Sequence, residues 1–137
     1  MKRAGAILFV VLSGCRAHGE SAEAVRAEAG QVARAVRTLR DAPNEAKAPL
    51  LDALSATPCS ANDVCAARDA CAAAYGIQVQ ALENLHAVRR AATGSTDPVP
   101  SAAVDVLARA ESDLRRAADQ EKACADLEAA LTKKYGL

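Results

Sequence analysis

Residues 61–93 read ANDVCAARDACAAAYGIQVQALENLHAVRRAAT and residues 101–135 read SAAVDVLARAESDLRRAADQEKACADLEAALTKKY, with the loop GSTDPVP (94–100) between them. Both long segments are rich in Ala, the strongest helix former, because its side chain loses no rotamer entropy in a helix. The Gly, Asp and two Pro residues of the loop interrupt a helix. We therefore expect two long helices that pack antiparallel as a hairpin around the loop.

Larger apolar residues recur at helical spacing in both segments. In the first segment they include Val64, Tyr75, Val79, Leu82, Leu85 and Val88. In the second, the residues expected on the buried side are Val104, Leu107, Leu114, Cys124, Leu127, Leu131 and Tyr135. The residues expected among the solvated positions are Arg115, Arg116, Glu121 and Lys122. Gly76 could end the first helix in a left-handed cap, but we favour a helix that continues through it.

A further amphipathic helix is expected upstream, over 21–41. Its apolar stripe consists of Val25, Ala29, Val32, Val36 and Leu39. Ser21 is a suitable N-cap, because its hydroxyl can accept a hydrogen bond from a free backbone N–H, and Pro43 marks the end of the helix.

The segment between this helix and the hairpin indicates a short connecting helix. Pro49 is followed by several Leu residues, which favours about two helical turns near 48–56. Residues 60–63 (SAND) resemble a capping box with Asp63 at the reciprocal position. No segment alternates apolar and polar residues as a strand would. The predicted fold is therefore all-α: an Ala-rich three-helix bundle containing a long antiparallel hairpin, stapled by disulfides.

The cysteine positions predict those disulfides. Around a loop centred on residue 97, facing residues of the hairpin have numbers that sum to about 194, so Cys71 and Cys124 are expected to be bonded. Cys59 is then expected to pair with Cys65 at the start of the helix. The spacing Cys-x5-Cys-x5-Cys differs from the Cys-x2-Cys of zinc sites, so no metal site is expected.

The first fifteen residues, MKRAGAILFVVLSGC, have the pattern of an export signal. A positively charged start at 2–3 precedes an apolar run over 4–12, which is shorter than the roughly 20 residues that span a bilayer. The run ends in Leu12-Ser13-Gly14-Cys15, and this ending resembles the lipobox of bacterial lipoproteins.

The resemblance implies that residues 1–14 are removed as a signal peptide and that the Cys15 thiol is acylated. Residues 15–20 would be a lipidated tether, and 21–137 a single helical domain facing the periplasm. Arg16 follows the Cys, and this favours the outer over the inner membrane by analogy with enteric lipoproteins, which use Asp there for retention. Four Cys remain besides Cys15. Because this number is even, all four can be paired in disulfides, which form in an oxidising compartment. The alternative is an ordinary secretory signal.

No cofactor or catalytic motif is present in the sequence. The 17 basic and 17 acidic residues balance, and beyond the apolar run only Tyr75 and Tyr135 carry aromatic rings, so a nucleic-acid partner is not expected. His18 is expected to be solvated in the tether, and His86 to lie in a surface charge cluster without a nucleophile. The acidic pairs are also expected at the solvated surface; they are Glu111 with Asp113 and Asp126 with Glu128.

Two classes of function fit this sequence. The first, which we favour, is a non-catalytic envelope lipoprotein whose helical module contacts a protein partner, self-associates or has a structural role. The alternative is a small-ligand or metal-binding helical bundle, or an unrecognised enzyme, with a pocket between its helices. Exposed apolar patches would favour the first class, and a cavity with converging polar groups the second.

Overall fold

The computed structural model describes residues 21–93 and 100–137. The expected signal peptide, the tether and most of the expected loop (94–99) lie outside the described residues. The described residues form helices and no strand; the elements are α1 (Ala22–Asp41), the 3-10 turn η1 (Asn44–Ala46), α2 (Lys47–Ser55), α3 (Asn62–Ala92) and α4 (Ser101–Tyr135). The protein is an all-α helical bundle, as predicted.

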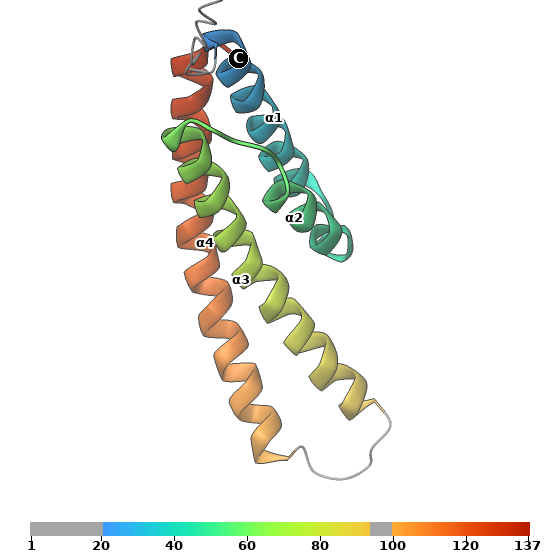
Figure 1. Cartoon of the computed structure of the whole chain (residues 1–137). Helices are drawn as coiled ribbons and strands as arrows, with labels where there is room; N and C mark the ends of the chain where they lie inside the picture. The colour runs from blue at the N-terminus through green and yellow to red at the C-terminus, as the bar shows by residue number, and fades with distance from the viewer. Residues whose placement is uncertain (1–20, 94–99) are drawn as a thin grey trace, which may run out of the picture.

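Helices α3 and α4 form a long antiparallel hairpin, and α1 and α2 pack along only part of it (Figure 1). The covered part is the one nearest the start of α1 and the end of α4. Beyond it, the hairpin continues as two helices alone. We call this outer part the distal hairpin and define it as residues 82–92 and 101–114.

Local sequence features explain where these helices begin and end. The hydroxyl of Ser21 caps α1 by accepting a hydrogen bond from the N–H of Ala24 at 3.1 Å. Helix α3 continues through Gly76, as predicted. Helix α4 ends at Gly136, whose φ of 62° lies in the left-handed region that favours glycine.

The core lies where α1 and α2 meet the hairpin. It contains few large side chains and several Ala residues, so the helices approach closely. Its fully or almost fully buried members are Ala29, Val32, Val36 and Leu39 on α1, Leu54 on α2, Val64, Ala67, Cys71 and Tyr75 on α3, and Cys124 and Leu131 on α4.

Two disulfides staple this fold, and their pairing is the predicted one. Cys71 on α3 is bonded to Cys124 on α4, with both residues buried and their Cα atoms 4.9 Å apart. Cys59 is bonded to Cys65 in the first turn of α3, with Cα atoms 5.3 Å apart. The first bond fixes the register of the hairpin, and the second fixes the chain as it enters α3.

The predicted buried side of α4 is partly wrong. Val104, Leu107 and Leu127 are 55%, 39% and 36% exposed. Val104 and Leu107 lie on the distal hairpin, beyond the reach of α1 and α2. Leu127 is exposed because it lies outside the narrow buried stripe of α4, which consists of Ala110, Ala117, Cys124, Glu128 and Leu131.

The predicted capping box is also wrong. Helix α3 has Ala61 as its N-cap, with no capping side chain. The hydroxyl and N–H of Ser60 donate instead to the Glu28 carboxylate, at 2.7 and 2.8 Å. Asp63 accepts hydrogen bonds from Lys134 and Tyr135. The Asp63 carboxylate therefore accepts from the end of α4, and the N–H of Ser60 donates to a carboxylate of α1.

The start of α1 and the end of α4 lie at the same end of the molecule. The Arg26 guanidinium donates a hydrogen bond of 2.8 Å to the carbonyl of Gly136, which ties the two helices together there. Among the described helices, none is both long enough and apolar enough to cross a membrane.

Candidate functional site

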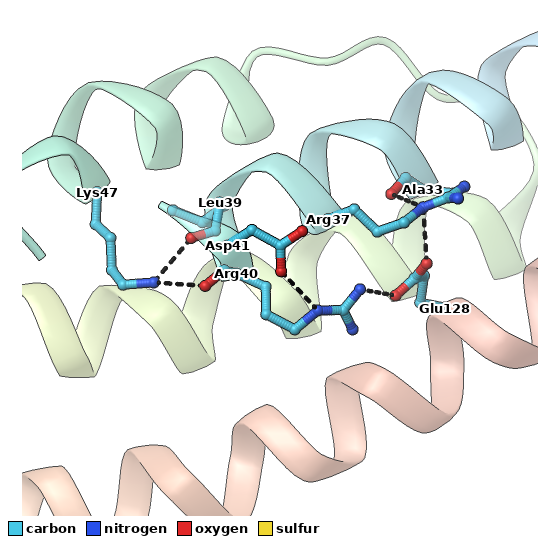
Figure 2. Close-up of polar contacts among 7 residues, drawn as sticks. All are labelled: Ala33, Arg37, Leu39, Arg40, Asp41, Lys47 and Glu128. Carbon is cyan, nitrogen blue, oxygen red and sulfur yellow. Dashed lines mark hydrogen bonds and ion pairs between the residues drawn. The ribbon is translucent and has the colours of Figure 1, made fainter. Parts of the chain in front are cut away.

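An ion cluster lies where α1 meets α4, and the buried carboxylate of Glu128 is its centre (Figure 2). Its side chain is 10% exposed, and each carboxylate oxygen contacts one arginine of α1. Arg37 Nε lies 3.1 Å from Oε1, and Arg40 Nη2 lies 2.9 Å from Oε2. Glu128 was predicted to be solvated. It is buried because two guanidinium groups compensate its charge.

Lys47 extends this polar region to α2. Its side chain is buried, and Nζ donates hydrogen bonds to the carbonyls of Leu39 at 2.8 Å and Arg40 at 3.1 Å (Figure 2). These carbonyls lie in the last turn of α1, where a positive charge is favourable. Nζ also lies 5.2 Å from the centre of the Tyr75 ring, within cation–π distance. Lys47 therefore clamps the start of α2 to the end of α1.

Two titratable side chains, Tyr75 and Glu121, lie near the Lys47 contact between α1 and α2. Burial raises the pKa of the Tyr75 hydroxyl above its usual value. Burial also raises the pKa of Glu121, and the positive charge of Lys47 partly opposes this shift. Glu121 is thus half-buried beside the α1–α2 layer, whereas the sequence predicted it to be solvated.

A second polar contact joins the start of α3 to the end of α4. Lys134 Nζ donates to Asp63 at 2.7 Å, and this bond is the main reason that the pKa of Asp63 is lowered. The Tyr135 hydroxyl adds bonds of 3.1 Å. A lowered carboxyl pKa stabilises the fold above the unfolded pKa near 3.8, and that stability is lost as the pH falls through the folded value.

Both polar regions hold helices together. Their carboxylates are occupied by arginine or lysine, and the lysine of the clamp is occupied by carbonyls. Over residues 21–93 and 100–137, no three His, Cys, Asp or Glu side chains are grouped so that they could hold a metal ion. His86 is exposed on α3, and His18 lies outside the described residues.

An open cavity of about 600 Å³ lies where η1 and the start of α2 meet α3. Polar residues from both sides line it, among them Asn44, Glu45, Glu83, His86 and Arg90. It is a step in the surface, because the α1–α2 layer ends there while α3 continues. The sequence did not predict this step, which exists only because η1 turns the chain back halfway along the hairpin.

Replacing Glu128 by Gln is expected to lower the free energy of unfolding by about 1–2 kcal/mol. The loss is smaller than for a fully buried ion pair, since Arg37 and Arg40 are 47% and 39% exposed and water can solvate them. Urea unfolding followed by circular dichroism measures it. The matched control is Glu111→Gln, which removes an exposed pair with Arg115 and should cost no more than about 0.5 kcal/mol. Equal losses would contradict a special role for the cluster.

Comparison of the chain with protein-family models, with curated proteins and with solved structures finds no match.

Proposed function

We propose that this chain is an exported lipoprotein, anchored to a membrane of the bacterial envelope by acyl chains on Cys15. Its disulfide-stapled helical module faces the periplasm and acts by protein contact rather than by catalysis. The outer membrane is the favoured location, because Arg16 and not Asp follows the acylated residue.

The pairing of the cysteines carries this proposal. The four Cys other than Cys15 form two disulfides, and Cys15 alone is left for lipid. Disulfides of this kind persist in the periplasm, whereas the cytosol keeps thiols reduced. Export is also what the lipobox resemblance of residues 12–15 implies, so two independent features of the sequence support the same compartment.

The contact role is supported by the distal hairpin. Val104 and Leu107 are large apolar residues, and both are exposed there. Exposed apolar residues gathered on one element are typical of surfaces that bind another protein.

The anchor is tested by cell fractionation and by the mass of the N-terminal peptide. The wild-type chain should enter the membrane fraction and begin at Cys15, with the added mass of two or three acyl chains. Cys15→Ser should lose both the acyl mass and membrane association. The double replacement Cys59→Ser with Cys65→Ser is the control and should stay in the membrane. A wild-type chain with a free Cys15 thiol and residues 1–14 attached would overturn the proposal.

A further inference from the structure

The two disulfides differ in their access to solvent. Cys71 and Cys124 are 0% and 1% exposed, and their bond lies inside the interface between α3 and α4. Cys59 and Cys65 are only half-buried, and their bond lies where the linker from α2 enters α3. A thiolate must reach a sulfur atom before it can exchange with a disulfide, so access largely decides which of the two bonds reacts in the folded chain.

The linker between α2 and α3 (56–61) contains Cys59, and hydrogen bonds also hold it in place (Figure 1). The Arg68 guanidinium donates a hydrogen bond of 3.0 Å to the carbonyl of Thr57, which ties the linker to α3. The N–H of Ser60 donates to Glu28 of α1 at 2.8 Å. Water competes for hydrogen bonds at the surface, and each contributes little to stability. The disulfide is therefore the strongest constraint on the linker.

The first turn of α3 also depends on this bond. Cys65 lies in that turn, and no side chain caps it. The bond to Cys59 restrains the turn in place of a cap. Asp63 lies in the same turn, and its carboxylate accepts hydrogen bonds from Lys134 and Tyr135 at the end of α4. Opening the disulfide therefore loosens both the start of α3 and its contact with α4.

We infer that Cys59–Cys65 is a site of thiol–disulfide exchange, and that a dithiol partner reduces it while the helices stay packed. A thiolate of the partner attacks one sulfur of the pair; a mixed disulfide forms, and the other cysteine leaves as a thiolate that takes up a proton. The second thiol of the partner loses its proton and attacks the mixed disulfide, which releases the second cysteine. Two electrons pass to the pair, and the partner becomes a disulfide.

The rest of the fold does not require this bond. Cys71–Cys124 still joins the two helices of the hairpin, and Leu39 and Leu54 still fill the core between α1 and α2. The loosened region lies at the same end of the molecule as the start of α1, which directly follows the expected tether (Figure 1). The pair is thus a redox-sensitive device at that end. This inference goes beyond the proposed function, and the exchange itself does not depend on the anchor.

Reduction of the folded full chain in mild detergent tests this inference. The chain is incubated with dithiothreitol at neutral pH, free thiols are alkylated at successive times, and the tryptic peptides are analysed by mass spectrometry. We expect Cys59 and Cys65 to become free at least about 100-fold faster than Cys71 and Cys124, which are the internal control. Alkylation at Cys15 is read from a separate peptide, so failure of the anchor and failure of this inference are distinguishable.

Hydrogen exchange of the selectively reduced chain tests the structural consequence. Amides of residues 57–66 should exchange at least about tenfold faster than in the oxidised chain, and those of the hairpin around Cys71 and Cys124 should stay within about twofold. The double variant Cys59→Ser with Cys65→Ser should show the same pattern without reductant. Reduction of both disulfides at equal rates would overturn the inference, as would unchanged exchange over 57–66 after reduction of the pair.

Discussion

Replacing Cys71 and Cys124 together by Ala is expected to lower the free energy of unfolding by about 4 kcal/mol. The bond joins residues 53 apart, so its loss frees a long loop in the unfolded chain. Both residues are buried at the centre of the hairpin, where the core holds mostly small side chains. Urea unfolding of the oxidised chains, followed by far-UV circular dichroism, measures the difference.

The second disulfide provides the control for this experiment. Cys59 and Cys65 are only six residues apart, so replacing both by Ala should cost about 2 kcal/mol. Comparing the two double variants separates the stabilisation that depends on the length of the closed loop from any effect common to the loss of either disulfide. If the short-range pair cost as much as the long-range pair, loop length would not explain the stabilisation.

Leu39→Ala is expected to lower the free energy of unfolding by about 3 kcal/mol. Leu39 is completely buried in the last full turn of α1, and its replacement leaves a cavity beneath the Lys47 clamp. The Lys47 and Glu128 contacts hold the surrounding helices together, so we expect them to relax only partly into the cavity. Thermal and urea unfolding should both show the loss.

Leu127→Ala is the matched control, because the same atoms are removed from a side chain that is 36% exposed. We expect a loss below about 1 kcal/mol. This pair of variants also tests the corrected orientation of α4, since the sequence pattern had placed Leu127 on its buried side. A loss at Leu127 as large as that at Leu39 would restore the original prediction.

The hairpin could be predicted because its signals are local. A loop with Gly, Asp and two Pro residues lies between two Ala-rich segments, and α4 ends at a glycine. The register then followed from the loop position by counting, and it brought Cys71 opposite Cys124. Local signals that agree with one another in this way specify a fold well.

The burial of individual residues could not be predicted in the same way. Whether Leu107 or Glu128 is covered depends on where α1 ends along the hairpin, and that is set by contacts far apart in the sequence. Glu128 is buried because Arg37 and Arg40 reach it from another helix. The sequence does place both arginines next to buried residues of the α1 stripe, which indicates that they could contact another helix. It does not identify the carboxylate with which they pair.

The start of α1 lies beside the end of α4, and this determines where a label should be attached. Leu137 follows directly on the residue that Arg26 holds, so a fluorophore or affinity tag added after it would lie beside the start of α1. The opposite end of α4 is about 50 Å away, given 35 residues at 1.5 Å each. A probe of the surroundings of that remote end must therefore be inserted between α3 and α4, because a terminal fusion would report on the wrong end of the rod.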